Sequence, residues 1–468
     1  MSVILEKFFA ALPAAERELL LGYATADPLH NAFSKKRITH ARISDQPLES
    51  AAAQKVWQEL MQRTTPKPGR RAAYLHIPFC QTKCLYCGFF QNHYQEDTAT
   101  AYVDHLIKEL EQASDYPYLQ NGLIHAVFIG GGTPSSLSPA NISRLLLAVR
   151  KNLPLANDYE LTLEGRINDL RPDKLEAWFA GGVNRISIGV QSFQTKLRQQ
   201  LGRIDPLEIV VKNLQTASGY EQCSVIVDLI YGLPDQTMDL WEQDLEILDN
   251  LPVDGMDLYQ LNVYENSALR QAITAGTISP AATTAQQAQM FAFASAWLDK
   301  RPYTRLSNRH WSKNSRERSL YNNLAKSGVE MFPFGSGGGG KLSTYRCMLQ
   351  RSLPTYMQMV SQNLKPLMVM SRHHAQQSIY NKITFQLEQS YLDLNSLAAS
   401  YGNELLELQW LLNLWEQRGL LKNNGVIYQL TVPGQFWIVN LTQTLLETVH
   451  YLFEGKLTPA SQPIAAQG

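Results

Sequence analysis

The spacing of apolar residues divides the chain into a helical beginning and a middle part of alternating strands and helices. Through residues 1–70, apolar side chains recur three or four positions apart, a spacing typical of helices. Residues 64–71 contain two prolines and a glycine, a composition that predicts a linker. We therefore expect residues 1–70 to form a helical N-terminal extension.

From residue 73, short β-rich runs alternate with helical stretches. The expected strands are 73–77, 125–129, 159–164, 185–190, 224–231 and 256–263, and the expected helices are 98–114, 139–152, 172–179, 207–217, 238–248 and 281–298. Repeated βα units predict parallel strands joined by right-handed helical crossovers. The expected fold class is therefore α/β, with a partial (βα)6 barrel over residues 71–300 and its chemistry at the carboxyl ends of the strands.

Two further regions follow the predicted barrel. Residues 301–370 are less regular and contain the glycine-rich run 335–340, where the missing side chains would let the backbone approach a ligand. Residues 371–468 show helical patterns followed by a short β-hairpin. The expected elements there are helices at 376–386, 394–401 and 404–418 and hairpin strands at 419–421 and 426–430. This order predicts a winged-helix-like C-terminal domain, which we expect to cap the mouth of the barrel.

The composition is that of a folded protein without a strong charge imbalance. Of 468 residues, 44% are hydrophobic and 18% are charged, which supports a packed core. Forty-two Lys and Arg balance forty-two Asp and Glu, so no basic field favours nucleic acid or an anionic membrane. The chain begins without a secretory pattern, and no run of about 20 apolar residues occurs. We expect a cytoplasmic protein with no membrane span and no nucleic-acid partner.

Three of the five cysteines, Cys80, Cys84 and Cys87, fall within eight residues, whereas Cys223 and Cys347 stand far away. So few cysteines in this length do not make a disulfide framework. Three thiolates on one loop suit zinc or an iron–sulfur cluster. Structural zinc usually has four ligands in two pairs, and no second pair is present in the sequence. A [4Fe–4S] cluster would keep one iron open; the alternatives are a zinc site completed by a histidine and three unrelated thiols.

The segment 74–90, YLHIPFCQTKCLYCGFF, resembles the cluster loop of the radical S-adenosylmethionine (SAM) superfamily. The resemblance extends to about residue 340. It implies a [4Fe–4S] cluster held by Cys80, Cys84 and Cys87, with SAM bound to the open iron through its amino and carboxylate groups. In that family, reduction cleaves the C5′–S bond of SAM and yields a 5′-deoxyadenosyl radical.

Nine further residues match SAM-binding positions of the family, residue by residue. They are Tyr74, Tyr86, Gly131, Gly132, Thr133, Glu164, Gln191, Arg203 and Asp228. The resemblance assigns the segment 131–133 and Glu164 to the SAM on the cluster. It assigns Gln191, Arg203 and Asp228 to the surroundings of a second SAM. Without the resemblance, the glycines would be assigned to a turn, and the polar residues to the surface or, for Asp228, to a buried pair.

Within the superfamily, the chain resembles the branch that contains oxygen-independent coproporphyrinogen III oxidase, a heme chaperone and the heme-utilisation enzymes. The oxidase has a fourth cysteine two residues after the third, where this chain has Phe89. The chaperone begins almost at the cluster loop, whereas here 70 residues precede it. The phrases CGFFQN at 87–92 and LTVPGQFWIVNL at 430–441 resemble the heme-utilisation enzymes most.

Resemblance to the heme-utilisation enzymes implies anaerobic degradation of heme. Such an enzyme is a radical SAM C-methyltransferase that uses two SAM molecules, methylates a meso carbon of heme, opens the macrocycle and releases iron, leaving the linear tetrapyrrole anaerobilin. The implied partners are heme as substrate, a flavodoxin- or ferredoxin-type electron donor, and a heme- or tetrapyrrole-handling protein. The alternatives are the coproporphyrinogen oxidase reaction, a non-enzymatic heme carrier and a DNA-binding regulator, which the zero net charge disfavours.

No motif marks the residues that would contact heme. A lone histidine is more often packed or exposed than an iron ligand, and His76 on the first predicted strand is expected to be structural. The candidates for iron or propionate contacts are Arg309, His310, Arg316, Arg318, Arg346, His373 and His374.

Overall fold

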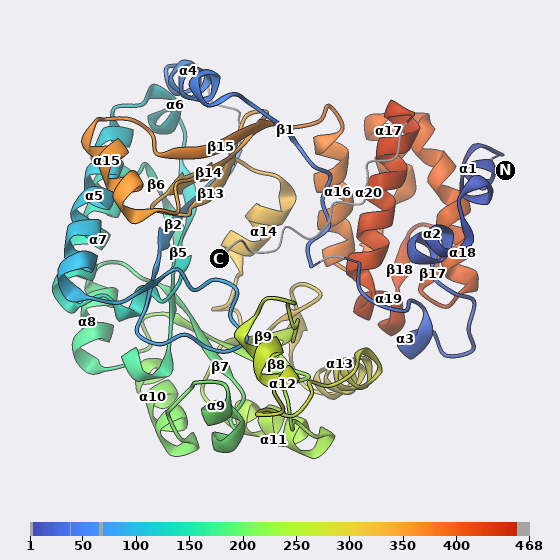
Figure 1. The fold of residues 1–468 in the computed structure, drawn as a ribbon, viewed down its shortest axis with the longest axis horizontal. Helices are drawn as coiled ribbons and strands as arrows, with labels where there is room; N and C mark the ends of the chain where they lie inside the picture. Colours follow the sequence, from blue (N-terminus) through green and yellow to red (C-terminus); the bar gives the residue numbers. More distant parts are fainter. Residues whose placement is uncertain (1–2, 38, 65–68, 456–468) are drawn as a thin grey trace.

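The computed structural model describes residues 3–37, 39–64 and 69–455. Residues 65–68, half of the linker expected at 64–71, therefore lie outside the described residues. The molecule has a lobe built on a large sheet with helices outside it, and a second lobe of helices (Figure 1). Figure 1 shows the N-terminal helices α1 to α3 in the second lobe, among helices from the other end of the chain.

Six parallel strands form the centre of the sheet and confirm the predicted α/β fold. They are, in spatial order, β2 (Arg71–Ile77), β5 (Ile124–Gly131), β6 (Leu155–Gly165), β7 (Arg185–Gln191), β8 (Ser224–Tyr231) and β9 (Gly255–Gln260). The main connecting helices are α5 (Glu96–Ser114), α7 (Pro139–Asn152), α8 (Pro172–Ala180), α10 (Leu207–Gly219), α11 (Met238–Asp249) and α13 (Thr284–Asp299). The sheet is open, because β1 (Gln46–Pro47) and β10 (Thr304–Arg305) stand at its two edges.

The glycine-rich region extends this sheet instead of forming an irregular loop. Strand β12 (Met331–Phe334) pairs parallel with β2, and three antiparallel strands continue from it. These strands are β13 (Gly339–Leu342), β14 (Tyr345–Leu349) and β15 (Leu367–Arg372). Residues 335–338 turn the chain between β12 and β13, and Gly335 has φ +83°, a conformation that glycine adopts without strain. The glycines therefore form the turn of a β-hairpin. The sequence did not predict this hairpin, because so glycine-rich a run usually indicates an irregular loop.

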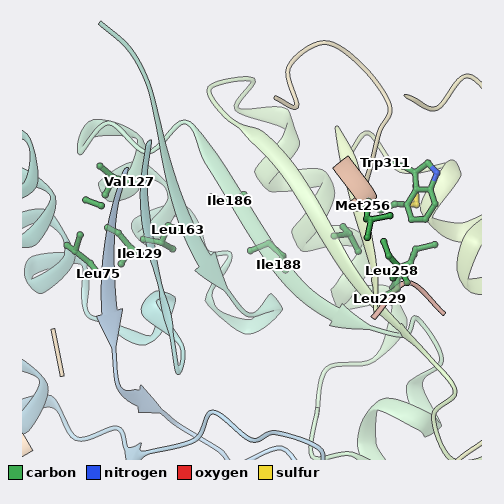
Figure 2. Packing of buried hydrophobic residues seen from close by; sticks show 14 of the residues in the cluster. Leu75, Val127, Ile129, Leu163, Ile186, Ile188, Leu229, Met256, Leu258 and Trp311 are labelled. Atoms are coloured by element: carbon green, nitrogen blue, oxygen red, sulfur yellow. The ribbon is translucent and has the colours of Figure 1, made fainter. Parts of the chain in front are cut away.

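The two faces of the parallel strands differ in polarity. Buried aliphatic side chains point towards the helices, and Figure 2 shows Leu75, Ile129, Leu163 and Ile188 among them. Successive residues of a strand point to opposite faces. The intervening residues therefore face the interior of the curved sheet, and many are polar. They include Tyr74, Thr162, Glu164, Arg185, Ser187, Asp228 and Asp257.

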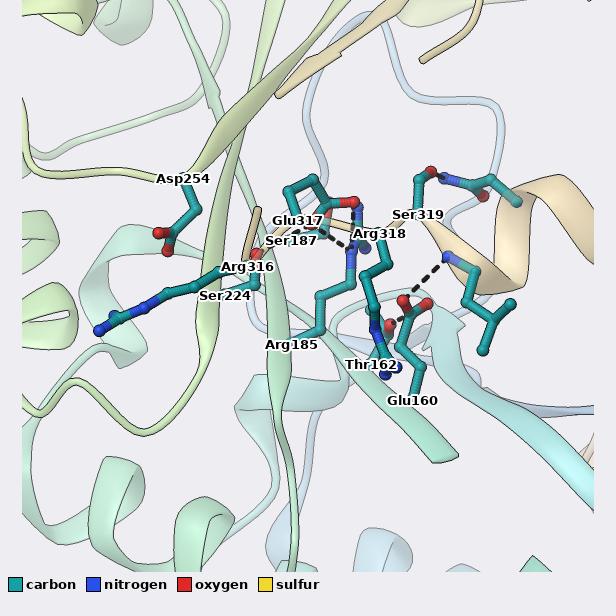
Figure 3. Close-up of polar contacts among 12 residues, drawn as sticks. Glu160, Thr162, Arg185, Ser187, Ser224, Asp254, Arg316, Glu317, Arg318 and Ser319 are labelled. Atoms are coloured by element: carbon teal, nitrogen blue, oxygen red, sulfur yellow. Dashed lines mark hydrogen bonds and ion pairs between the residues drawn. The ribbon is translucent and has the colours of Figure 1, made fainter. Parts of the chain in front are cut away.

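A buried ionic network fills the amino-terminal end of this interior. Glu317 accepts hydrogen bonds from Arg185 Nε at 3.0 and 3.1 Å and from the Ser224 hydroxyl at 2.9 Å (Figure 3). Its side chain also pairs with His310 on β11 (His310–Ser312), at 3.1 Å. The chain before α14 (Leu320–Ser327) thus closes one end of the sheet, and the carboxyl ends of the strands remain for the site.

The C-terminal region has the predicted winged-helix-like order of helices followed by a small sheet. Its elements are α16 (Gln377–Glu388), β16 (Tyr391–Leu392), α17 (Leu394–Tyr401), α18 (Gln409–Gln417), β17 (Leu421–Asn423) and β18 (Tyr428–Leu430). Two more helices follow, α19 (Val432–Phe436) and the long α20 (Ile438–Glu454). We call residues 373–455 the cap.

The N-terminal extension packs against this cap. Helices α1 (Val3–Ala11), α2 (Ala14–Leu21) and α3 (Pro28–Asn31) contribute aromatic contacts and hydrogen bonds to it. The Phe8 ring stacks on Tyr451 with centroids 3.9 Å apart, and Trp415 Nε1 donates to the carbonyl of Leu21 at 3.1 Å. Arg37 forms a buried ion pair with Glu447 of α20 at 2.9 Å. Helix α4 (Ser50–Met61) instead packs beside the sheet next to β15.

Shorter elements complete the fold. They are β3 (Phe79–Cys80), β4 (Asn92–His93), α6 (Pro117–Gln120), α9 (Thr195–Gln200), α12 (Ala268–Thr274) and α15 (Leu353–Ser361). The pair β3 and β4 brackets the loop that carries the clustered cysteines.

Candidate functional site

A cavity of about 460 Å³ lies at the carboxyl ends of the parallel strands. Three parts of the chain line it: the strand ends with the cysteine loop, three residues of the extension, and four residues of the cap. The extension contributes Lys36, Thr39 and His40, and the cap contributes Gln435, Phe436, Ile438 and Val439. The cap is joined to the strand ends by Gln435, which accepts a hydrogen bond from Arg305 and whose carbonyl accepts one from Asn308 at 3.0 Å. The cap therefore covers the mouth of the barrel.

Cys84 and Cys87 line this cavity, and Cys80 lies buried behind it. The Thr133 hydroxyl donates to Cys80 Sγ at 3.3 Å, which joins the start of the cysteine loop to the segment after β5. The backbone N–H of Phe89 donates to Cys87 Sγ at 3.3 Å. Phe89 itself is 67% exposed and lines the cavity at the place where the oxidase resemblance expects a cysteine.

Two arginines hold the cysteine loop from opposite sides. Arg203 donates to Tyr86 Oη at 3.0 Å and to the carbonyl of Gly189 at 2.8 Å, so it ties the loop to β7. Arg166, just after β6, donates to the hydroxyl and carbonyl of Thr82 at 2.8 and 3.0 Å. Burial raises the pKa of Tyr86 to about 12 despite the neighbouring guanidinium, so its hydroxyl stays protonated. Arg166 was missed in the sequence, although it follows Glu164 by two residues at a strand end.

The loop fits a [4Fe–4S] cluster better than a single metal ion. Within the part of the chain that the structure describes, no three His, Cys, Asp or Glu side chains converge on one ion position. A cubane cluster does not need such convergence, because each thiolate binds a different iron. Three cysteines on one loop, with two of them facing a cavity, match a cluster that keeps one iron accessible.

Glu164 approaches the backbone of the glycine turn after β5. The Gly131 N–H donates to Glu164 Oε2 at 3.1 Å. A Cβ at Gly130 would lie 2.8 Å from the same oxygen, so a larger residue there would push the carboxylate away. Burial raises the pKa of Glu164 to about 7, although the Gly131 N–H opposes the shift. The Glu164 carboxylate lines the cavity and would gain from a cationic ligand.

Gln191 sits at an irregularity at the end of β7. The register with β8 shifts between Gly189 and Gln191, and Gln191 has φ +72°, which is rare for a residue with a side chain. A Cβ at Gly189 would lie 2.6 Å from the Gln191 amide nitrogen, so the glycine makes room for the amide above the strand. Such strain is typical of positions that serve a site.

Asp228 on β8 also faces the cavity and accepts a hydrogen bond from the Ser187 hydroxyl at 3.1 Å. Burial, and then the nearby carboxylates of Asp257 and Glu164, raise the pKa of Asp228 to about 8. The cavity thus holds two carboxyl groups whose raised pKa values leave a substantial fraction of each protonated near neutral pH in the ligand-free protein.

The structure brings most of the SAM-assigned residues onto one surface, with one exception. Residues 131–133, Tyr86, Glu164, Gln191, Arg203 and Asp228 all line the cavity. Tyr74 lines a second cavity of about 460 Å³, where the cap and extension meet β13 and β14. The Tyr74 hydroxyl hydrogen-bonds to His76 at 3.0 Å. His76 is buried and also contacts Gln91 at 3.3 Å, in agreement with the expected structural role.

Of the heme candidates, only Arg309 lines the first cavity. His310 is enclosed by Asp257 at 2.9 Å and Glu317 at 3.1 Å, so both of its ring nitrogens already face carboxylates of the protein. Although burial alone lowers it, these two carboxylates raise the pKa of His310 to about 9. The remaining candidates lie away from this cavity. Arg316 and Arg318 flank the ionic network (Figure 3), His373 and Arg346 line the second cavity, and His374 bonds to the carbonyl of Ser44.

Several cavity residues had no signal in the sequence. Lys36 and His40 come from the extension, and Phe436 comes from the cap. These residues lie far in the sequence from the strand ends and belong to no motif with them. Only the folded structure shows that they line the same cavity.

The family comparison agrees with this geometry. A model of the radical SAM superfamily matches residues 74–248. An anaerobilin synthase of Escherichia coli O157:H7 is 36% identical over 409 residues, which cover 87% of this chain and 90% of that protein. The chain belongs to the radical SAM superfamily. Membership of the radical SAM superfamily implies that the protein holds a [4Fe–4S] cluster and uses SAM.

Two further comparisons match a heme chaperone and a porphyrinogen-oxidising radical SAM enzyme. Heme chaperone HemW of Escherichia coli (strain K12) is 38% identical over 195 residues, 42% of this chain and about half, 51%, of that protein. The structure of coproporphyrinogen III oxidase (HemN) from Escherichia coli has a TM-score of 0.72 at 22% identity and covers 84% of this chain and 93% of its own. The latter likeness shows the fold. In addition, none of the described helices combines the length and apolar character needed to cross a bilayer.

Proposed function

We propose that the protein degrades heme without oxygen, as a radical SAM C-methyltransferase that methylates a meso carbon, opens the macrocycle and releases iron to leave a linear tetrapyrrole. The observation that carries this proposal is the extent of the match to anaerobilin synthase, 87% of this chain and 90% of that protein. A match of that length continues outside the barrel region 71–300. The shared sequence is therefore not limited to the cluster-binding barrel.

The residues that line the cavity suit a flat, mostly apolar ligand that carries carboxylate groups at its edge. Tyr259, Phe291 and Phe436 contribute aromatic surface, and Lys36 and Arg309 contribute positive charge to the same cavity. A porphyrin has an extended apolar ring that stacks on aromatic groups, and its propionates pair with cations.

The roles that we propose for the chain's residues follow the strand order. Glu164 and the Gly131 N–H would bind one SAM beside the cluster loop, and Gln191 and Asp228 would orient a second SAM next to heme. Arg203 would keep the cluster loop against β7. When bound, the cluster and SAM supply a carbon-centred radical by reductive cleavage of SAM. The protein would contribute positioning and limit the access of water, because residues of the cap and the extension line the cavity opposite the strand ends.

An anaerobic reaction with methyl-deuterated SAM tests the proposal. Reconstituted protein would receive heme, labelled SAM and a flavodoxin-type reductant, and the products would be followed by absorbance and mass spectrometry. We expect loss of the Soret band and deuterium in a linear tetrapyrrole. An unlabelled tetrapyrrole would rule out the methyltransferase reaction even if the Soret band disappeared.

Two other functions have support from the comparisons and are separated by running the assay with heme and, in parallel, with coproporphyrinogen. Coproporphyrinogen oxidation is the second candidate because HemN shares the fold. An enzyme of that kind would convert anaerobically supplied coproporphyrinogen and leave heme intact. A heme carrier is the third, because heme chaperones match the barrel. A carrier would bind heme and return it unchanged, with or without SAM.

A further inference from the structure

Among the histidines that the structure describes, His40 alone lines the cavity. It belongs to the segment of the extension that runs along α20, held there by the Arg37–Glu447 ion pair and by Asn440, whose amide donates to the carbonyl of Lys35 at 3.1 Å. Its side chain is exposed, and its ring makes no hydrogen bond or ion pair with another described residue. An imidazole with no hydrogen-bond or ion-pair partner among the described residues therefore borders the cavity from the side of the extension.

The surroundings of His40 keep this imidazole neutral. Although part of the side chain reaches solvent, desolvation by the surrounding protein and then the adjacent Arg309 lower the pKa of His40, with Arg42 and Lys326 acting in the same direction and Glu388 against it. A neutral imidazole nitrogen carries the lone pair that binds iron. The His40 imidazole is therefore neutral at neutral pH, as a metal ligand must be, and no other described side chain hydrogen-bonds to it.

Lys36 adds a buried cation close by. Its ammonium donates to the Gln260 side chain and lies 4.8 Å from the centroid of the Phe436 ring. Among the described residues no carboxylate acts on it, and burial together with Arg309 lowers its pKa to about 7. A buried ammonium without a counter-ion is unfavourable. A carboxylate of a ligand would supply the missing charge.

Arg309 offers a second cation on the same wall. One of its nitrogens donates to Glu388 at 3.4 Å, and Arg309 also borders the cavity, where its remaining N–H groups can donate to an oxygen of a ligand. Tyr259 and Phe291 supply apolar surface between the strand ends and the cap. Imidazole, two cations and aromatic walls are the groups that an iron porphyrin with two propionates requires.

We propose that His40 is the axial ligand of the heme iron and that Lys36 and Arg309 bind the heme propionates, so the N-terminal extension forms part of the substrate site. This inference rests on the proposed action on heme and names the residues that would orient the macrocycle. It assigns roles to Lys36 and His40, which precede the radical SAM region at 74–248.

Spectra of ferric heme bound to the full-length protein test the iron ligand without SAM, reductant or turnover. We expect the wild-type complex to show a histidine-ligated spectrum by absorbance and electron paramagnetic resonance. His40→Ala should lose that signature and bind heme at least about tenfold more weakly, and added imidazole should restore the signature. His105→Ala is the matched control, because His105 lies on α5 and bonds to Ala101 and Ser361, away from the cavity. Unchanged SAM binding by His40→Ala would show that the variant is folded.

The propionate contacts are tested with heme dimethyl ester, whose carboxylates are blocked. Lys36→Met should weaken binding of heme roughly tenfold and leave binding of the ester nearly unchanged, since the lost interaction is with the charge. Lys35→Met is the control, because Lys35 is exposed and its side chain does not line the cavity. Arg309→Gln should act like Lys36→Met, with an added loss from the Glu388 pair.

The outcomes separate this inference from the proposed function. A wild-type protein that degrades heme, together with a His40→Ala variant that keeps the wild-type heme spectrum, would overturn the ligand assignment alone. Equal losses for heme and its ester in Lys36→Met would overturn the propionate assignment. A wild-type protein that neither binds nor changes heme would overturn both this inference and the proposed function.

Discussion

At the scale of single residues, the charge state of the site depends on Glu164 and Asp228. Both carboxyl groups face the cavity, and burial raises their pKa values to about 7 and about 8. In the ligand-free protein, a large fraction of both groups is therefore protonated at pH 7. A cation such as the sulfonium or ammonium of SAM would favour their ionised forms and lower both pKa values.

The binding of SAM should therefore release protons and tighten as the pH rises. When the pH is below the pKa of a carboxyl group in the free protein, that group must lose a proton before it can pair with SAM, which costs free energy. For each such group, lowering the pH by one unit weakens SAM binding by up to about tenfold. We expect the affinity to increase from about pH 6 and to level off above about pH 8, as measured by calorimetry in buffers of different ionisation enthalpy. Glu164→Gln should weaken SAM binding and flatten this profile, and a wild-type profile that is flat from pH 6 to 8 would contradict the argument.

The five cysteines should divide into two groups on substitution. Replacing Cys80, Cys84 or Cys87 by Ala should abolish the iron–sulfur absorbance, with about four iron and four sulfide per chain lost after reconstitution. Cys223→Ala and Cys347→Ala should keep the cluster. Burial raises the pKa of both of these thiols to about 12, and neither faces the cavity. Loss of the cluster in Cys223→Ala would contradict the three-cysteine site.

At the scale of elements, the ionic network around Glu317 joins β7, β8 and β11 beneath the site. Although burial alone raises it, Arg185 and His310 lower the pKa of Glu317 to about 2. His310 has its pKa raised to about 9 by Asp257 and Glu317. The Glu317 contribution to stability is thus present above its unfolded pKa of about 4.3 and is lost as the pH falls towards 2. The His310 contribution is complete below about pH 6.5 and is lost as the pH rises through 9.

Glu317→Gln should destabilise the fold strongly, because it leaves Arg185 and His310 buried without their shared counter-ion. We expect a loss of about 3–5 kcal/mol in the free energy of unfolding, measured by denaturant titration near pH 6, where all three groups are charged. Glu246→Gln is the control, since Glu246 lies exposed on α11. A change below about 1 kcal/mol in Glu317→Gln would show that the network contributes little.

At the scale of the whole molecule, the two ends of the chain form one wall of the cavity. Helices α1 to α3 pack into the cap (Figure 1), and Lys36 and His40 line the cavity together with Phe436. Arg37 and Glu447 connect the two parts by an ion pair with both side chains buried. The extension and the cap should therefore loosen together when this pair is broken.

Arg37→Met should raise hydrogen–deuterium exchange both in residues 36–42 and in α20, because Glu447 is left buried and unpaired. Exchange in β5 to β8 should stay at the wild-type level, since these strands lie in the sheet. Arg17→Met, at an exposed position of α2, serves as the control. Faster exchange confined to residues 36–42 would show that the cap keeps its structure without the extension.

Much of the barrel and the cluster loop could be predicted from the sequence, because both depend on short-range patterns. Apolar alternation within each strand and the three-cysteine spacing are local, and the strand-end residues Glu164, Gln191 and Asp228 follow from the βα order. The extra parallel strand β12 was missed, because its pairing with β2 joins residues about 260 positions apart and its glycine-rich neighbourhood suggests a loop.

The sequence by itself determined the α/β class, the radical SAM family and the residues that reach the strand ends. Only the tertiary structure decided which distant segments complete the cavity: Lys36 and His40 from one end of the chain and Phe436 from the other. It also removed His310 from the heme candidates by enclosing it between Asp257 and Glu317. The reason is physical. A strand's period is set by its own backbone geometry, whereas the walls of a cavity are set by packing between segments whose sequences carry no record of each other's positions.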